Sequence, residues 1–203
     1  MKDCLDTSWE LVKLIKFSPK REAMLRELKE QTGSDAPGVR TLCPTRWTVR
    51  AGSLASIVAN YDNIQLLWET AVCATSDTEM KARIQGVASQ MQTFRFLFCL
   101  LLSEMILRHA DKLSQTLQQH KLSSIEAHGV AMLTVKTLET LRTDDNFDMF
   151  WQKVVMTKEQ VNVNKPRLPR RRKLPRRFEQ GNAPAEFAVS AKDEYRRVYF
   201  EAL

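Results

Sequence analysis

The sequence predicts an all-α protein that folds as an irregular helical bundle. Glycine and proline, which disfavour helix interiors, number only 6 and 7 in 203 residues. Apolar residues make up 43% of the chain, an ordinary level for a folded core. Apolar side chains also recur every three or four residues over most of the stretch 1–161, which is the spacing of one face of a helix.

The first two helices are expected on either side of Ser18-Pro19. Residues 3–17 carry a broad apolar stripe that includes Leu11. Serine is a good N-cap and proline suits the first helical position, so this pair marks the start of the second helix. Residues 32–40 contain two glycines and a proline and are expected to form a loop.

One long helix is expected after residues 44–47. Its inward face is a row of apolar side chains spaced by three or four positions: Leu54, Ile57, Val58, Tyr61, Ile64, Trp68 and Val72. The helix is expected to end at 74–78, where Asp77 or Thr78 serves as the N-cap of another helix.

Residues 91–107 are apolar almost all round, which predicts the central helix of the bundle. The longest uninterrupted apolar run within it, 96–102, has seven residues, whereas a membrane span needs about 20. We therefore expect a core helix and no membrane segment. A separate short helix carrying Leu113 and Leu117 is expected to follow.

Two more helices are expected before the composition changes. Ser123 and Glu126 have the spacing of a capping box, so a helix begins there. Its inner face is expected to hold Ala127, Ala131, Val135, Leu138 and Leu141. The next helix covers 144–160, with its apolar residues at helical spacing.

The chain thus divides into three parts. Residues 1–161 form a helical domain, residues 162–189 a basic, proline-rich arm or linker, and residues 190–203 the start of a C-terminal helix capped by Ser190 and Asp193. The apolar stripe of this last helix continues to the final residue without a stop signal. We therefore expect the sequence to be part of a longer protein.

The positive charge of the chain is concentrated in the arm. Between residues 165 and 177 there are eight basic residues and no acid: Lys165, Arg167, Arg170, Arg171, Arg172, Lys173, Arg176 and Arg177. Subtracting these eight charges from the net charge of +7 leaves the remaining 190 residues at −1. Three prolines among the cations exclude regular helix over much of the segment and favour an extended chain.

Such a cationic segment predicts a polyanionic partner. The phosphate backbone of nucleic acid is the natural one, and its binding falls steeply with salt. A nuclear-import signal and a plain solvated linker are the two alternative interpretations, and all three are compatible with one another.

Arg46 and Trp47 are a second candidate contact with nucleic acid. A tryptophan beside an arginine at the mouth of a helix can stack on a base. The alternative is that Trp47 belongs to the core while Arg46 caps a neighbouring carbonyl. The other tryptophans, Trp9, Trp68 and Trp151, lie in helical apolar stripes and are expected in the core.

Nothing in the sequence indicates an independent active site, a metal site or a cofactor. The glycines are dispersed and form no phosphate-binding loop, and Asp144-Asp145 are explained as acids at a helix start. The cysteines at 4, 43, 73 and 99 show no metal-ligand spacing with the three histidines. Free thiols in a reducing compartment are favoured over disulfides or zinc.

An ordered set of motifs resembles hAT-superfamily transposases, in particular transposon-derived proteins of the zinc finger MYM type. It extends over essentially the whole chain and comprises residues 42–50 (LCPTRWTVR), 54–57, 60–61, 93–98, 113–118, 150–152, 168–172 and 195–200.

The resemblance implies a position within a larger enzyme. Members of this family have an RNase H-like core with three metal-binding acids, interrupted by a large helical insertion. The resemblance implies that this chain is mostly that insertion and that the three acids lie outside it, so no catalytic residue is carried over. Only Arg46 and Trp47 match a family motif with a role, since that tryptophan region lies near the active site and contacts the DNA end.

The leading hypothesis is a non-catalytic fragment or domesticated remnant of a hAT-type transposase. It would act in the nucleus and contact DNA through the basic arm. The alternative is a helical protein-interaction module with a nuclear-import-like basic segment and no role at DNA. A third hypothesis, an active nuclease, predicts metal-dependent DNA cleavage, which we do not expect. The oligomeric state is left open.

Overall fold

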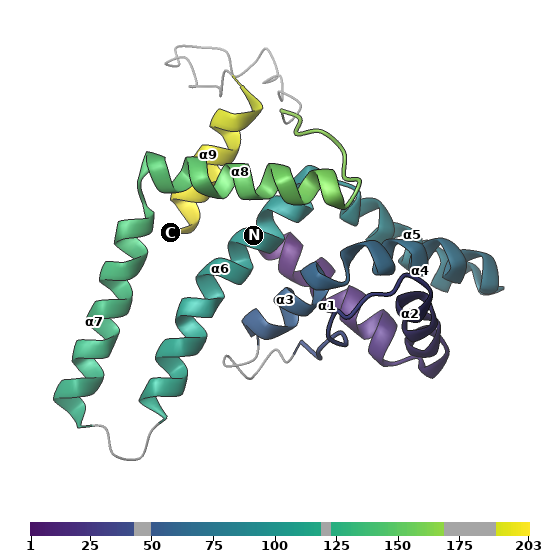
Figure 1. Cartoon of the computed structure of the whole chain (residues 1–203), viewed down its shortest axis with the longest axis horizontal. Coiled ribbons are helices and arrows are strands. Elements are labelled where there is room, and N and C mark those ends of the chain that lie inside the picture. Colours follow the sequence, from purple (N-terminus) through teal and green to yellow (C-terminus); the bar gives the residue numbers. More distant parts are fainter. Residues whose placement is uncertain (43–49, 119–122, 169–189) are drawn as a thin grey trace, which may run out of the picture.

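The computed structural model describes residues 1–42, 50–118, 123–168 and 190–203. Over these ranges the chain forms nine helices and no strand (Figure 1), which confirms the predicted all-α fold. The helices are α1 (Lys2–Lys16), α2 (Pro19–Gln31), α3 (Arg50–Ala59), α4 (Tyr61–Ala74), α5 (Thr78–Met91), α6 (Phe94–Leu117), α7 (Ser124–Leu141), α8 (Asp144–Gln160) and α9 (Ala191–Ala202).

Helix α6 is the centre of the bundle, as its composition predicts. Its first half is buried on nearly all sides, from Phe94 to Leu102 with Arg95 as the exception. Helices α1, α3, α5, α7 and α8 all pack against it. The predicted break before Leu113 is wrong, because α6 continues to Leu117 as one helix of 24 residues. Asp111 helps to hold this second half in place, because its buried carboxylate accepts a hydrogen bond from the Ala51 N–H of α3 at 3.2 Å.

The predicted long helix is two helices, since the chain breaks at Asn60 between α3 and α4. The Asn60 side chain is fully buried, and its amide donates to the carbonyls of Ser56 and Pro37, both at 2.7 Å. A short polar side chain that hydrogen-bonds nearby backbone competes with the helical ladder. The apolar spacing continues across the break because Ile57, Tyr61 and Ile64 are all buried.

Helix starts are well predicted by their caps. The side chains of Ser18, Asp77 and Ser123 accept hydrogen bonds from backbone amides in the first turns of α2, α5 and α7. Both predicted capping pairs, Ser123–Glu126 and Ser190–Asp193, form complete capping boxes. Each cap satisfies backbone N–H groups that lack a partner at a helix start.

An aromatic cluster holds α8 and α9 on the first half of α6. Its members are Phe94, Phe98, Phe147, Phe150, Trp151, Tyr195 and Tyr199. Tyr195 meets Phe94 edge-on with ring centroids 5.0 Å apart, and Tyr199 meets Phe147 at 5.5 Å. Edge-on aromatic pairs add about 1 kcal/mol beyond the area they bury. The cluster therefore fixes α9 to the helical body although residues 169–189 separate it from α8 in the sequence.

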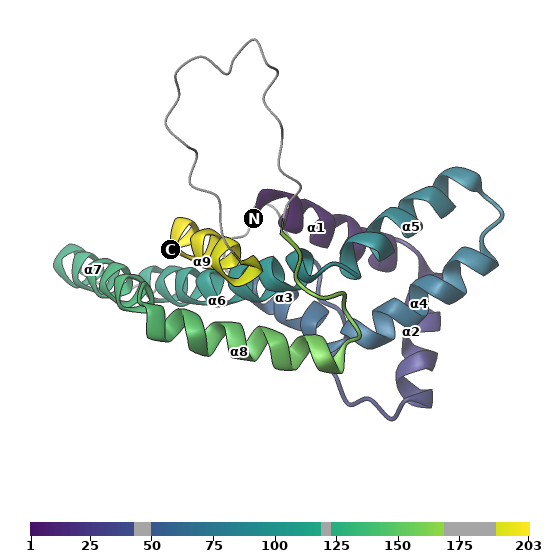
Figure 2. The same ribbon diagram turned by 90° about the horizontal axis from the view of Figure 1, so that it is seen from above.

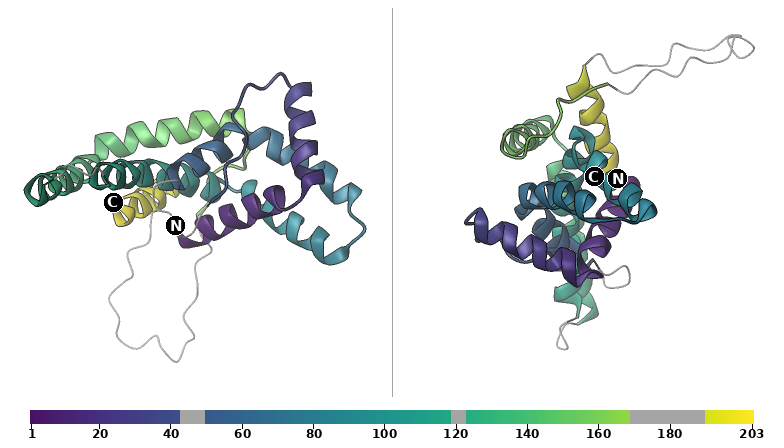
Figure 3. Two further views of the ribbon diagram at one scale, coloured as in Figure 1. Left: turned by 90° about the horizontal axis from the view of Figure 1, so that it is seen from below. Right: turned by 90° about the vertical axis from the view of Figure 1, so that its right-hand side faces the viewer.

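Helix α7 lies at the opposite end of the molecule from α2 and runs beside the second half of α6 as a helical hairpin (Figures 1, 2 and 3). None of its residues is buried. Four residues of its predicted inner face, Ala127, Ala131, Leu138 and Leu141, are half-buried, whereas Val135 is exposed. The inner-face prediction is wrong for Val135, because the hairpin covers α7 on one side only.

The tryptophan predictions hold for two of the three residues. Trp68 is buried and its indole N–H donates to the sulfur of Met91 at 3.1 Å, and Trp151 packs in the aromatic cluster. Trp9 is 41% exposed, with the Lys13 ammonium 4.6 Å from its ring centroid, so its predicted core position is wrong. A cation over the ring compensates in part for this exposure.

Candidate nucleic-acid interface

The basic arm begins on residues that are fixed to the helical body. After α8 the chain turns at Asn162, which has a φ of +46°, a conformation that asparagine tolerates better than most residues. Val161 and Val163 on either side are buried. The Asn164 N–H donates to the Gln92 carbonyl between α5 and α6 at 3.0 Å. Two apolar anchors and one backbone hydrogen bond thus place residues 165–168 beside the start of α6.

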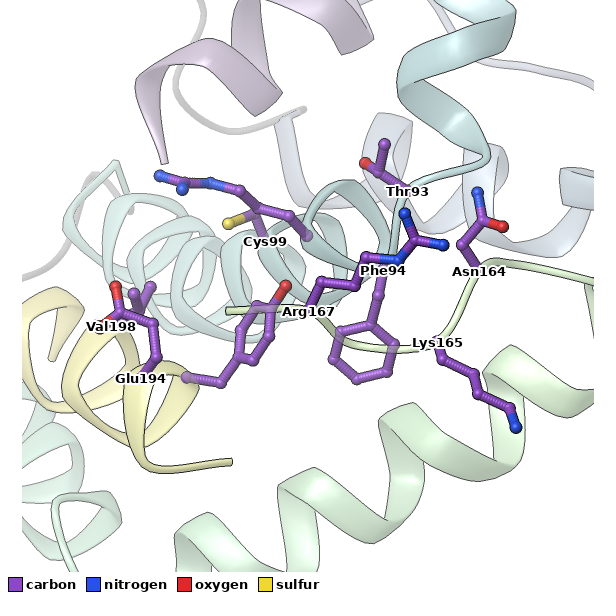
Figure 4. A pocket seen from close by; sticks show the side chains of 10 residues that line it. Thr93, Phe94, Cys99, Asn164, Lys165, Arg167, Glu194 and Val198 are labelled. Carbon is purple, nitrogen blue, oxygen red and sulfur yellow. The ribbon is translucent and has the colours of Figure 1, made fainter. Parts of the chain in front are cut away.

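Lys165, Arg167 and Arg95 together make this part of the surface cationic. All three side chains are exposed, and none forms an ion pair with a residue that the structure describes. They line a cavity of about 230 Å³. The other lining residues are Thr93, Phe94, Cys99, Asn164, Glu194, Tyr195 and Val198. In Figure 4 the Arg167 side chain reaches toward Thr93 at the start of α6, whereas Lys165 points away from the other side chains.

The cavity has an aromatic wall with one unsatisfied hydroxyl. Phe94 and Tyr195 are 2% and 6% exposed. The hydroxyls of Tyr61 and Tyr199 donate to the carbonyls of Met91 and Leu141, at 2.5 and 2.9 Å. The Tyr195 hydroxyl, in contrast, forms no hydrogen bond with any described residue. This oxygen is not among the buried polar atoms that lack a partner, so it is open to the cavity and available as a donor to a ligand.

The Tyr195 hydroxyl stays protonated at neutral pH. Burial raises the pKa of Tyr195 to about 12, and the nearby Cys99 adds to the increase. The positive charge of Arg95 acts in the opposite direction on the same pKa. Arg95 and Tyr195 thus present a cation and an O–H donor to the same cavity.

The basic residues of α9 are arranged differently, because each has an acidic partner. Lys192 pairs with Asp148 at 2.6 Å, Arg196 with Asp144 at 2.5 Å, and Arg197 with Glu194 at 2.9 Å. The first two pairs join α9 to α8. Exposed pairs of this kind contribute little to stability. They nevertheless neutralise the charges of the α9 cations. The three cations at the cavity, in contrast, have no acidic partner among the described residues.

Of the sequence-predicted DNA-binding residues, the structure describes two, Lys165 and Arg167, and it places both at the cavity. The others lie outside the described residues: Arg46, Trp47, Arg170, Arg171, Arg172, Lys173, Arg176 and Arg177. Arg95 and Tyr195 join the site without having been predicted. Arg95 is the one charge within the apolar run at the start of α6, a signal that could have singled it out.

Both flanks of the Arg-Trp segment are attached to the body. On its N-terminal side, Val39 and Leu42 are buried, and the Arg40 N–H donates to the Ser56 hydroxyl at 2.9 Å. On its C-terminal side, α3 starts at Arg50. Burial raises the pKa of Asp111, while the Ala51 N–H and the Arg50 charge lower it. The segment thus begins and ends on packed residues.

The structure shows no group suited to metal binding within residues 1–42, 50–118, 123–168 and 190–203. Cys4 and Cys99 are buried free thiols, and Cys73 is an exposed one. Burial raises the pKa of Cys4 to about 12 and also raises that of Cys99, so both stay protonated at neutral pH. Cys43 lies outside the described residues.

No single described helix is long and apolar enough to cross a membrane; only α5 and α6 taken together pass by composition, and they are bent by 77° at their junction. No protein-family model matches the sequence, and no solved structure matches the fold.

Proposed function

We propose that this chain contacts the phosphate backbone of DNA through the basic segment 165–177. The observation that carries the proposal is the position of its first cations. Lys165 and Arg167 are exposed and form no ion pair with the residues that the structure describes, and the Asn164–Gln92 hydrogen bond holds them beside a third such cation, Arg95. Clustered cations repel one another unless an anion lies between them, and a polyphosphate backbone supplies one.

In this function the helical body is the rigid support and the basic segment makes the contacts. Phosphate contacts position a protein on nucleic acid without reading its sequence. If all eight cations of the segment contact duplex DNA, the logarithm of the binding constant falls with the logarithm of the salt concentration with a slope of about −7. Arg46 and Trp47 are proposed as a second contact, by stacking on a base near a DNA end.

We further propose that the chain derives from a hAT-type transposase and acts in the nucleus as a non-catalytic fragment or domesticated remnant. The ordered motifs around Arg46-Trp47 and Tyr195 support this origin. The all-helical fold is compatible with the helical insertion of such an enzyme. Genomic sequence on either side of the coding region tests the origin, because acids in an RNase H-like pattern are expected there.

Duplex binding at two salt concentrations tests the DNA-binding function. The quadruple variant Arg170→Ala, Arg171→Ala, Arg172→Ala and Lys173→Ala is expected to lose most of the affinity and to have a shallower salt slope. The matched control removes four exposed cations of the body: Lys20, Arg26, Lys112 and Lys136. Both variants lose the same charge, so equal losses of affinity would contradict a role for the segment.

A second candidate function, protein interaction, is favoured by the outer surface of α7. Ile125, Met132, Leu133 and Val135 are 83%, 55%, 65% and 48% exposed, and α7 has no buried residue. Contiguous exposed apolar side chains mark interaction surfaces. If protein interaction is the function, the intact chain is expected not to bind duplex DNA even at low salt, and the basic segment would serve as a nuclear-import signal.

A further inference from the structure

Three polar groups from different parts of the chain line the cavity at the start of the arm. Arg95 and Arg167 contribute guanidinium groups from α6 and from the extended segment after α8. Tyr195 contributes a hydroxyl from α9 that lacks a hydrogen-bond partner among the described residues and is open to the cavity. Three segments distant in the sequence thus converge on one cavity, which distinguishes it from a general basic surface.

We infer that this cavity binds a single phosphate group, held by the guanidinium groups of Arg95 and Arg167 and by the hydroxyl of Tyr195. Arginine is the side chain best suited to phosphate, because its planar fork donates two parallel hydrogen bonds. A protonated tyrosine hydroxyl adds a neutral donor that a phosphate oxygen can accept. The inference rests on the proposed function for the source of the phosphate, a nucleic-acid strand, although inorganic phosphate presents the same chemistry.

The cavity is large enough for a terminal phosphate. Its volume of about 230 Å³ corresponds to roughly eight water molecules at about 30 Å³ each. This holds a phosphate with the sugar attached to it, so a strand end can enter with its sugar against the side chains of Phe94 and Val198.

The acid in the cavity does not cancel its cations. Glu194 lines the cavity, but its carboxylate is engaged with Arg197 at 2.9 Å. The Thr93 hydroxyl donates to the Gln90 carbonyl at 2.7 Å and caps the start of α6, so it is engaged as well. Arg95, Arg167 and the Tyr195 hydroxyl remain without partners among the described residues, as does Lys165, which points away from the other side chains in Figure 4.

The first test titrates the whole chain with inorganic phosphate and monitors binding through the NMR signals of the arginine Nε–H groups. The Nε–H signals of Arg95 and Arg167 are expected to shift, while that of Arg26, exposed on α2, stays in place. Tyr195→Phe is expected to weaken phosphate binding at least threefold, and Arg95→Gln at least tenfold. Equal shifts with acetate at the same ionic strength would overturn the inference, since the cavity would then bind any small anion.

The second test uses one single-stranded oligonucleotide in three forms, with a 5′ phosphate, a 3′ phosphate or no terminal phosphate. One phosphorylated form is expected to bind at least tenfold more tightly than the unphosphorylated form, and Arg95→Gln is expected to abolish the difference. If the quadruple arm variant loses DNA binding while Arg95→Gln and Tyr195→Phe leave both oligonucleotide and phosphate binding intact, the inference is wrong and the proposed function stands. If inorganic phosphate shifts Arg95 and Arg167 but no DNA binds, the cavity is a phosphate site and the proposed function is wrong.

Discussion

The Asn164 N–H donates to the Gln92 carbonyl at 3.0 Å, joining the first residues of the basic segment to the junction of α5 and α6. This is a backbone contact between residues 72 positions apart, and Val163 packs into the core immediately before it. Because the contact precedes Lys165, it sets where the row of cations starts on the surface.

Removing that hydrogen bond is expected to loosen the start of the arm. Asn164→Pro eliminates the N–H donor and leaves the Gln92 carbonyl without its partner, at a cost of about 1 kcal/mol in the free energy of unfolding. Asn164→Ala keeps the N–H and is expected to have nearly wild-type stability. Urea unfolding of both variants measures the difference, and equal midpoints would show that the hydrogen bond does not anchor the segment.

The stability of the fold is expected to respond differently to loss of the hydroxyl from two tyrosines on the same face of α9. Tyr199→Phe removes a hydrogen bond to the Leu141 carbonyl and is expected to lower stability by about 1 kcal/mol. Tyr195→Phe removes a hydroxyl that has no hydrogen-bond partner among the described residues and is open to the cavity, so it is expected to leave the melting temperature unchanged. Thermal unfolding by circular dichroism compares them. A larger loss for Tyr195→Phe would mean that its hydroxyl has a partner within the folded chain.

Asn60 is expected to be among the least replaceable polar residues. Asn60→Ala leaves the carbonyls of Ser56 and Pro37 without the amide that binds them, at a cost of roughly 2–4 kcal/mol. Asn162→Ala, on an exposed turn, is the control and is expected to cost about 1 kcal/mol, since alanine disfavours its positive φ. Urea unfolding followed by tryptophan fluorescence measures both, and equal costs would contradict the role given to the Asn60 amide.

The pH dependence of stability is expected to reflect Asp111. Burial raises its folded-state pKa above that of the unfolded chain, so the folded state binds the proton more strongly. The stability that this group contributes is present below the unfolded pKa, near 4, and is lost as pH rises through the folded pKa. Asp111→Asn keeps an acceptor for the Ala51 N–H and removes the titration.

Urea midpoints of wild type and Asp111→Asn, measured at a series of pH values rising from about pH 4 to about pH 7, test the expectation. The wild type is expected to lose more stability than the variant between about pH 4 and pH 7. The opposite order would show that the Arg50 charge outweighs burial at Asp111.

Features governed by local sequence were predictable. The caps at Ser18, Asp77 and Ser123 depend on residues within one turn, and α8 begins and ends at the predicted residues, Asp144–Gln160. The break at Asn60 was not predictable from apolar spacing. It depends on the Pro37 carbonyl, which lies 23 residues away in sequence and is brought to Asn60 by the fold.

The candidate site was predictable only in part. Lys165 and Arg167 stand out as charges in the sequence, and their position beside the helical body comes from the structure. Tyr195 belongs to an apolar stripe in the sequence, and its hydroxyl becomes a free donor only because α9 packs against α6. Contacts of this kind join segments about 100 residues apart, beyond the reach of any local pattern.

The one-sided support of α7 has a dynamic consequence. A helix without buried side chains opens at a small fraction of the free energy needed to unfold the whole domain. Its backbone amides should exchange with solvent first, ahead of those of α6, and limited proteolysis should cut within it while the aromatic cluster around Phe98 stays intact. We therefore expect a rigid end, where the basic segment is attached, and a second end that opens without disturbing it.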